Sequence, residues 1–266
     1  MQTHLLLLLA LSSTRAAATN GAVSVRNNPA KVRAMATIPA GNYRPLFTSA
    51  GRERVRIAAF RLDRVQVTRG DFADFVATHP QWRRSDVPAA QADAGYLSDW
   101  SASGSPGTTS ERARPVSSVS WFAARAYCEA QGKRLPTVDE WEYVAAADET
   151  RRDASDDPVV RNRILALTAA RGGKPPVAGR GAPNVYGVRD LHGVVWEWTQ
   201  EYNGIVQHAS HGAAGMPLAH DLYCAGGAIG ASDPSNYPAF ARFSVRGGLT
   251  RRSTSKSVGF RCAAKA

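Results

Sequence analysis

The stretch 184–198, NVYGVRDLHGVVWEW, is the part of the chain around which we expect the fold to be organised. If its last residues form a strand, Glu197 lies on one face, and Trp196 and Trp198 lie on the other. Asp190 adds a second acid, and two glycines allow a tight turn between the acids. The pattern predicts tryptophans in a core and an acid on a wet or ion-filled face. The alternative is a core strand on which Glu197 is merely solvated.

The composition indicates a folded globular protein. The chain has 266 residues, of which 44% are hydrophobic and 21% charged, so it can form one large domain or two modest ones. The formal net charge is +11, but the basic residues are scattered or stand in short pairs such as Arg83 and Arg84. Because the sequence contains no basic helix and no stripe of basic and aromatic residues, it disfavours a nucleic-acid partner.

Residues 1–18 have the features of a secretory signal peptide, with an apolar run at 5–11 and small residues at 16–18. The run is too short to span a bilayer, and no later stretch is long and apolar enough to do so. We therefore expect an exported protein, periplasmic or secreted, without a transmembrane segment. Residues 19–34 are expected to form a linker, and residues 35–266 a single domain.

The expected domain begins with strand-like segments, at 35–43 and 55–67. Thr68, followed three residues later by Asp71, is typical of a helix N-terminus, because each side chain can bond the backbone N–H of the other. Pro80 ends this helix, since proline cannot continue the hydrogen-bond ladder.

Two well-capped helices are expected in the middle of the chain. Ser120 is positioned to cap a helix that runs to Gln131 and stops at Gly132. Thr137 and Glu140 have the spacing of a capping box, which predicts a second helix directly after the first.

The other segments have weaker patterns. The turn-rich excursion 81–114 is expected at the surface, pinned by Trp82 and Trp100. The remaining predictions are a helix around 159–170 and strand-like pieces at 240–245 and 258–262.

Five blocks of the sequence, in this order, carry a resemblance to a known family: MATIPAGNY, FRLDRVQVTRGDFADF, PVSSVSWFAARAYCEAQGKRLPTVDEWEYVA, NVYGVRDLHGVVWEWT and VGFRCA. They resemble the signature blocks of the formylglycine-generating enzymes, also called sulfatase-modifying factors. The resemblance covers roughly residues 35–264. It implies one domain of the α+β class, related to C-type lectins, with short helices, scattered antiparallel strands and much loop.

The cysteines are Cys128, Cys224 and Cys262, and their spacing alone does not say which two pair in an oxidising compartment. The resemblance implies a structural disulfide between Cys128 and Cys262. In the chain-entropy model, closing a loop of that length stabilises the fold by about 4–5 kcal/mol.

The resemblance also implies a structural calcium site in the stretch 184–198. Asp190, Gly193, Val195 and Glu197 fall on the family's calcium-binding positions. Two carboxylates and two backbone carbonyls on a tight turn are chemically suitable, because Ca²⁺ takes several oxygen ligands. If this site forms, chelation of calcium should lower the melting temperature.

The aerobic enzymes of the family oxidise a substrate cysteine to formylglycine with copper(I), which two cysteines of a C-terminal loop hold. The corresponding loop here, 226–246, contains no cysteine. Because soft thiolates are the ligands that select copper(I), formylglycine formation by this mechanism is not expected. Cys224 lies just before the loop and is the candidate catalytic residue, either as a reactive thiol or as a buried inert one.

A second metal site, for copper or iron, is a further interpretation of the same region. His208, His211 and Cys224 lie close together in the sequence and include suitable ligands. No helix is predicted there to place the histidines on one face. The alternative is a loop with polar histidines and an unpaired thiol.

The functional interpretation is an exported accessory or maturation factor that acts on a periplasmic protein or peptide, and that is itself a monomer. The partner would bind in a groove bordered by Trp196, Cys224 and Arg246. The sequence also resembles the subset of the family that accompanies nitrite reductase. The alternatives are a divergent metal-dependent oxidoreductase of the same family and a lectin-like ligand-binding module.

Overall fold

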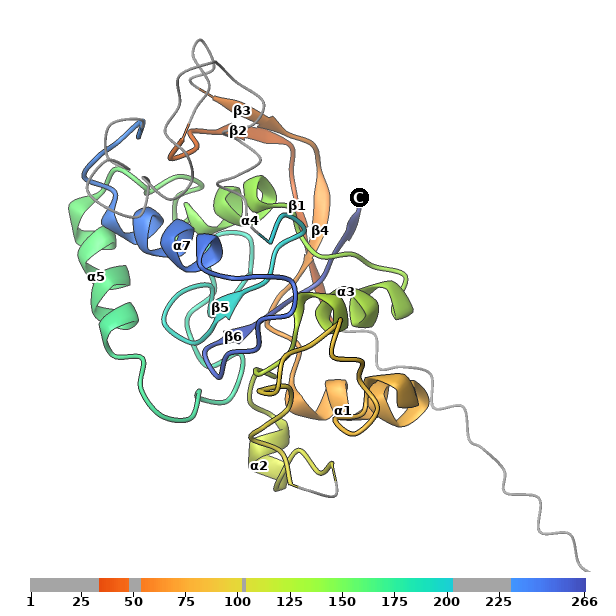
Figure 1. The fold of residues 1–266 in the computed structure, drawn as a ribbon. Coiled ribbons are helices and arrows are strands. Elements are labelled where there is room, and N and C mark those ends of the chain that lie inside the picture. Colours follow the sequence, from red (N-terminus) through yellow and green to blue (C-terminus); the bar gives the residue numbers. More distant parts are fainter. Residues whose placement is uncertain (1–33, 48–53, 102–103, 203–230) are drawn as a thin grey trace, which may run out of the picture. The chain divides into compact units, whose positions relative to one another are not determined.

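The computed structural model describes residues 34–47, 54–101, 104–202 and 231–266. The chain divides into the unit Met1–Val32 and the compact unit Arg33–Ala266. All described helices and strands belong to the second unit, which mixes short helices with small sheets (Figure 1). The α+β class predicted from the sequence is confirmed, whereas the predicted signal peptide and nearly all of the linker lie outside the described residues.

The described strands are short and form three small sheets. They are β1 (Met35–Ile38), β2 (Gly41–Tyr43), β3 (Val55–Ile57), β4 (Phe60–Asp63), β5 (Trp196–Glu197), β6 (Val258–Gly259) and β7 (Ala263–Lys265). The largest sheet has the order β1-β4-β7 and is antiparallel, so it joins the two ends of the described domain. A β2–β3 hairpin and a parallel β5–β6 pair complete the sheets.

The described helices surround these sheets. They are α1 (Arg69–Thr78), the 3-10 turn η1 (Pro80–Trp82), α2 (Thr109–Arg112), α3 (Trp121–Ala130), α4 (Val138–Ala145), α5 (Pro158–Ala169) and α7 (Tyr237–Gly247). The side chains of Thr68, Ser120 and Thr137 cap α1, α3 and α4, as the sequence predicts. Gly132 follows the end of α3 with a φ of +65°, a conformation that favours glycine.

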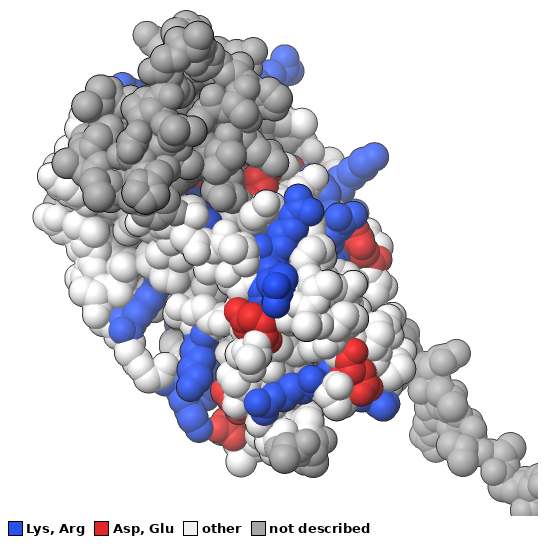
Figure 2. Space-filling model, in the orientation of Figure 1, with Lys and Arg blue, Asp and Glu red and all other residues white. Residues whose placement is uncertain are grey.

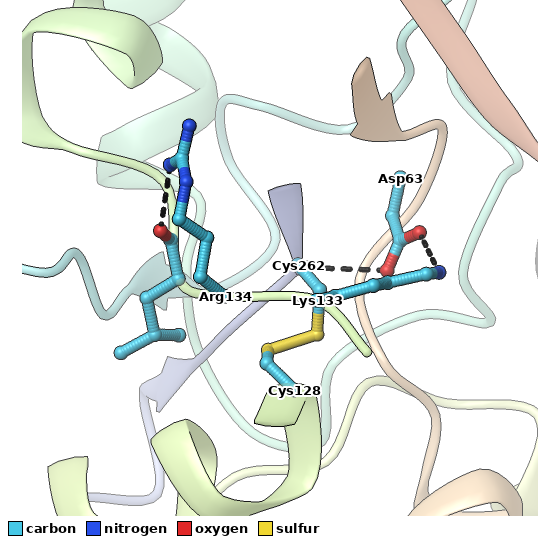
Figure 3. The surroundings of a disulfide bond; sticks show 6 residues. Asp63, Cys128, Lys133, Arg134 and Cys262 are labelled. Carbon is cyan, nitrogen blue, oxygen red and sulfur yellow. Dashed lines mark hydrogen bonds and ion pairs between the residues drawn. A yellow bond between two sulfur atoms is a disulfide. The ribbon is translucent and has the colours of Figure 1, made fainter. Parts of the chain in front are cut away.

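A disulfide between Cys128 and Cys262 lies in the main core, where it ties α3 to the C-terminal segment. This is the pairing that the family resemblance implies. Beside it, the almost fully buried Asp63 carboxylate accepts hydrogen bonds from Lys133 Nζ at 2.6 Å and from the Cys262 backbone N–H at 3.2 Å (Figure 3). The charge of Lys133 and the C-terminal backbone are thus fixed by one acid on β4.

The excursion 81–114 is anchored as predicted by two tryptophans. Trp82 and Trp100 are 7% and 5% exposed, and both pack in the same core as the disulfide. Long surface segments cost conformational entropy, and large buried anchors offset part of that cost.

The prediction for residues 240–245 was wrong, because they belong to the helix α7 and not to a strand. Asn236 caps this helix, and its buried face carries Ala239, Arg242, Phe243 and Arg246. These positions have helical spacing, but two of them are arginines, so the apolar pattern alone did not reveal the helix.

The interpretation of Glu197 as an acid on a wet or ion-filled face was also wrong. Only Trp196 and Glu197 form strand β5, and the side chain of Glu197 is fully buried. Strand β6 lies beside β5, and Arg261, which follows β6 in the chain, covers the acid.

No helix within the described ranges is long and apolar enough to cross a membrane. On the face drawn in Figure 2, Lys and Arg side chains alternate with Asp and Glu and do not form one continuous basic field.

Candidate functional site: two enclosed acids and the start of helix α7

Helix α7 is held by an ion cluster around Glu142, a residue of α4. Arg242 contacts both carboxylate oxygens, at 3.0 Å through Nε and 2.6 Å through Nη2, and Arg246 Nη1 donates to Oε1 at 2.6 Å. All three side chains are at most 10% exposed. Burial alone would raise the pKa of Glu142, but the two guanidinium groups lower it to about 2. The acid is therefore ionised, and it fixes α7 to α4.

A second enclosed acid, Glu197, is surrounded by four N–H donors. Arg261 binds both oxygens, with Nε 2.7 Å from Oε2 and Nη2 2.8 Å from Oε1. Trp141 Nε1 donates to Oε2 at 2.8 Å, and Gln66 Nε2 donates to Oε1 at 2.9 Å. The side chains of Glu197 and Arg261 are both 0% exposed. A bidentate guanidinium and two neutral donors thus neutralise this carboxylate inside the core.

Asp190, the other acid of the stretch 184–198, is also occupied. It has a φ of +59°, and its carboxylate accepts the backbone N–H groups of Gly179 and Gly181, the latter at 2.8 Å. Its carbonyl oxygen accepts Gln66 Nε2 at 2.6 Å. The Gln66 amide therefore lies between the Asp190 carbonyl and Glu197, and it donates to both.

The calcium site implied at Asp190, Gly193, Val195 and Glu197 stays a prediction, but the four N–H donors on the Glu197 carboxylate argue against that acid as one of its ligands. Ca²⁺ needs several oxygens that point at one empty position, but both carboxylates here already accept hydrogen bonds from N–H groups. Among the residues that the structure describes, no three His, Cys, Asp or Glu side chains are grouped so that they could hold a metal. Gly193 serves packing, because a Cβ there would lie 2.8 Å from Leu167 Cβ of α5.

The predicted groove residues have different roles. Trp196 and Arg246 line the same cavity, but its volume is about 10 Å³, room for no more than a water molecule. Arg246 is 6% exposed and belongs to the Glu142 cluster, so we correct its assignment from groove wall to scaffold. Arg171 covers Trp196, with its guanidinium carbon 3.6 Å from the ring centroid. Burial lowers the pKa of Arg171 to about 10.

The remaining candidates, His208, His211 and Cys224, lie outside the described residues. Their proposed metal site and the role of the thiol stay predictions.

The described end of the C-terminal loop forms a turn at 233–237, here called the α7 entry turn. Asp233 accepts the backbone N–H and the hydroxyl of Ser235, at 2.9 and 2.6 Å, and it forms an ion pair with Arg161. Partial burial opposes ionisation, but the bonds from Ser235 and the charge of Arg161 lower the pKa of Asp233. Tyr237, which begins the helix, is 64% exposed. The turn is thus a preformed surface with an outward-facing aromatic side chain.

Sequence reasoning missed both Arg161 and Asp233. The order Asp233-Pro-Ser235-Asn236 contains a signal, because an acid that bonds a serine two residues later and an asparagine cap are typical of a helix start. Arg161 carried no such signal, since its partner is seventy-two residues away in the sequence.

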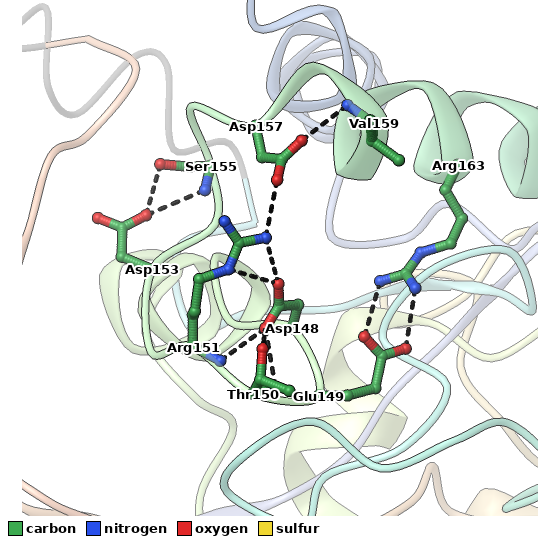
Figure 4. Close-up of polar contacts among 9 residues, drawn as sticks. All are labelled: Asp148, Glu149, Thr150, Arg151, Asp153, Ser155, Asp157, Val159 and Arg163. Atoms are coloured by element: carbon green, nitrogen blue, oxygen red, sulfur yellow. Dashed lines mark hydrogen bonds and ion pairs between the residues drawn. The ribbon is translucent and has the colours of Figure 1, made fainter.

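The segment before α5 is fixed by charges of the same kind. Asp148 accepts the backbone N–H groups of Thr150 and Arg151, and the Arg151 side chain bridges Asp148 to Asp157, the cap of α5 (Figure 4). Hydrogen bonds from Arg151 and Thr150 outweigh burial and lower the pKa of Asp148. This network places α5, and with it Arg161, beside the α7 entry turn.

A half-buried histidine lies beside this region. His192 lies edge-on to the Trp141 ring, and its Nε2 is 3.1 Å from the Ala145 carbonyl oxygen. Burial, and next the charge of Arg242, lower the pKa of His192 to about 3. The ring is therefore neutral at neutral pH and donates from Nε2 to the carbonyl.

Comparison with known proteins shows the family. Residues 21–266 match the model of the sulfatase-modifying factor enzyme 1-like domain. The chain belongs to this family. The match spans the α1–α4 region, both enclosed acids and α7, so the arrangement described above is that of a sulfatase-modifying factor domain.

Named relatives differ in what they are said to do. "Inactive C-alpha-formylglycine-generating enzyme 2" of Bos taurus is 33% identical over 166 residues, which cover 57% of this chain and 50% of that protein. The formylglycine-generating enzyme of Streptomyces coelicolor is 28% identical over 264 residues, covering 79% of each. The chain thus spans about half the length of the inactive mammalian relative. The structure of PvdO from Pseudomonas aeruginosa is 20% identical and covers 87% of this chain and 94% of that chain, with a TM-score of 0.48.

Proposed function

We propose that this sulfatase-modifying factor domain is an exported accessory or maturation factor, which binds a partner protein and does not make formylglycine with copper. The observation that carries the proposal is the absence of cysteine from residues 226–246. Without a pair of thiolates in this loop, the ligands that select copper(I) are missing. The nearest thiol in the sequence before the loop is Cys224, and one thiol does not make a pair.

The described residues around α7 form a scaffold of ion pairs, which supports a binding role. Glu142 fixes α7 through two arginines, and Arg161 fixes the α7 entry turn through Asp233. Such ion networks position a surface without supplying a reactive group. The exposed Tyr237 offers an aromatic contact of the kind that is enriched at protein interfaces.

The comparisons support the same direction. One relative is named an inactive formylglycine-generating enzyme, so the family includes a protein that is described as inactive. For this protein we infer that the partner is an exported protein or peptide. The α7 entry turn replaces Arg246 in the proposed contact surface, because Arg246 is buried.

The binding role can be tested by site-specific photocrosslinking in the organism that produces the protein. A photoreactive phenylalanine analogue at Tyr237 should crosslink one exported protein. The same analogue at Leu167, which is 45% exposed on α5, is the matched control and should not. Equal crosslinking at both positions, or none at Tyr237, would contradict the proposal.

The missing reaction needs its own assay. Purified protein with copper(I) and a cysteine-containing sulfatase peptide should produce no aldehyde, as measured by mass spectrometry. Aldehyde formation would overturn the accessory role. A metal analysis tests the alternative. Stoichiometric copper or iron that is lost on joint replacement of His208, His211 and Cys224 would support the hypothesis of a divergent oxidoreductase.

A further inference from the structure

A cavity of about 560 Å³ is lined in part by residues of α1. Helices α1 and α7 lie at different ends of the described domain (Figure 1). The volume of the cavity falls within the range of about 300–1,000 Å³ that is usual for small-molecule sites. We call it the α1 cavity. The residues that line it include Ala73, Val76, Arg83, Arg84, Leu97 and Trp100.

The floor of the α1 cavity is apolar and rigid. Leu97 and Trp100 are 2% and 5% exposed, and Trp100 packs edge-on against Phe72 of α1, with 6.3 Å between ring centroids. The floor of the cavity is therefore made of core side chains that are anchored behind it, whereas its rim includes the exposed Arg83 and Arg84.

The backbone of Leu97 is strained. Its φ is +46°, in the left-handed region that a branched side chain rarely adopts. The Leu97 N–H donates to the Ser118 carbonyl at 2.8 Å, and the Ser118 N–H donates to the Ser255 carbonyl at 2.8 Å. Strain of this kind persists only where the surroundings hold it, and it concentrates at ligand-binding sites.

The floor also contains an unsatisfied polar group. Within the described part of the chain, the buried indole N–H of Trp100 has no acceptor, which is unusual because buried donors are nearly always paired. The unpaired N–H lowers the stability of the fold, and the apolar packing of Trp100 does not explain why it is there. Such unfavourable features are found at cavity walls that bind a ligand.

Two arginines line the cavity without an acid to neutralise them. Arg83 and Arg84 are exposed, and no carboxylate in the described part of the chain forms an ion pair with either. The neighbouring arginines differ, because Arg69 pairs with Asp99 and Arg112 pairs with Asp74. Positive charge at this cavity is thus left available to an anion.

We propose that the α1 cavity binds a small carboxylate with an apolar body. Arg83 and Arg84 would receive the carboxylate, since a guanidinium group donates two parallel hydrogen bonds to it. The apolar body would lie against Leu97 and Trp100. This site is independent of the partner-binding surface at the α7 entry turn, so either proposal can fail without the other.

Octanoate and 4-phenylbutyrate serve as probes, because each joins one carboxylate to an apolar body. Isothermal titration of the full chain should show saturable binding of at least one of them. The neutral amide of the same probe should bind at least about tenfold more weakly, because it lacks the charge. The double variant Arg83→Gln/Arg84→Gln should lose affinity by a similar factor.

Two further variants keep the result interpretable. Arg125→Gln removes an exposed arginine on α3, away from the cavity lining, and should leave binding unchanged. Ala77→Trp fills the cavity from an exposed position of α1 and should abolish binding, with far-UV circular dichroism to show that the fold is kept.

Three outcomes would overturn the proposal. They are no binding of either probe at millimolar concentration, equal binding of acid and amide, and binding that survives both the double arginine variant and Ala77→Trp. Tighter binding of octyl phosphate than of octanoate would reject the carboxylate assignment in favour of a phosphate-bearing ligand.

Discussion

Glu142 and Glu197 are enclosed by arginines in the interior, whereas Asp233 lies in the partly exposed α7 entry turn with a single arginine partner. For each enclosed acid, both oxygens accept N–H donors, and the acid ties together segments far apart in the chain. Asp233 organises only its own turn and the adjacent α5. The interior charges therefore hold the architecture, and the turn presents a surface.

This difference shows what the domain has kept and what it lacks. The buried acid–arginine pairs hold α7 and the C-terminal segment in place. The segment 226–246, which runs into α7, contains no cysteine. Its described part carries Asp233, Ser235 and Tyr237. The family fold is thus present in a chain whose residues 226–246 contain no cysteine. The following predictions test whether the enclosed acids are structural and the turn dispensable for folding.

The largest effect is expected from breaking the Glu197–Arg261 pair. Arg261→Ala leaves a buried carboxylate without its counter-ion and should lower the free energy of unfolding by about 3–5 kcal/mol. Arg125→Ala, which breaks an exposed pair with Glu129, should cost about 0–1 kcal/mol. Urea denaturation measures both. A cost below about 1 kcal/mol for Arg261→Ala would show that the enclosed pair is not structural.

Removal of the disulfide should have the next largest effect. Cys128 and Cys262 are 134 residues apart. The double serine variant should lose about 2–4 kcal/mol, less than the chain-entropy model gives, because unfolded chains retain structure. Non-reducing peptide mapping of the wild type should find these two cysteines joined. A Cys224→Ser variant should keep the same link, and a bond from Cys224 to either partner would overturn the pairing.

Acid should destabilise the enclosed region through His192. Its pKa is about 3 in the folded protein and 6.5 without perturbation, so between these values the unfolded chain binds a proton that the folded chain does not. Stability therefore falls as the pH falls below 6.5, by up to about 2 kcal/mol at pH 5, and by less where solvent reaches the ring. His192→Leu should flatten this slope in denaturation curves. An unchanged slope would remove His192 as the cause.

The α7 entry turn should tolerate change. Asp233→Asn weakens one partly exposed ion pair and should cost about 1 kcal/mol or less, because such pairs contribute little. Thermal unfolding measures the difference. A loss as large as that of Arg261→Ala would mean that the turn also carries the fold.

The sequence predicts those parts of this fold that depend on neighbouring residues. The caps at Thr68, Ser120 and Thr137 lie within three residues of the groups they bond, so their helices were identified correctly. The pairing of Cys128 with Cys262 followed from family resemblance and not from local pattern.

The sequence does not reveal interactions between distant residues. Glu197 meets Arg261 sixty-four residues later, and Arg242 meets Glu142 one hundred residues earlier. Because these partners are distant, the local sequence predicts Glu197 to be an open acid or a calcium ligand. It predicts a strand where α7 lies, because the buried face of α7 is partly arginine. Whether a charge is solvated or enclosed depends on the tertiary fold, and no local pattern encodes it.

The most direct test of the central claim is the melting temperature of the full chain with and without EGTA. The claim is that Arg261 and Gln66, and not calcium, satisfy Glu197 and the turn at Asp190. Because every oxygen of both carboxylates already accepts a protein N–H, the melting temperature should not change on chelation. A fall of several degrees with EGTA, reversed by added calcium and absent in Glu197→Ala, would contradict the claim and restore the calcium site.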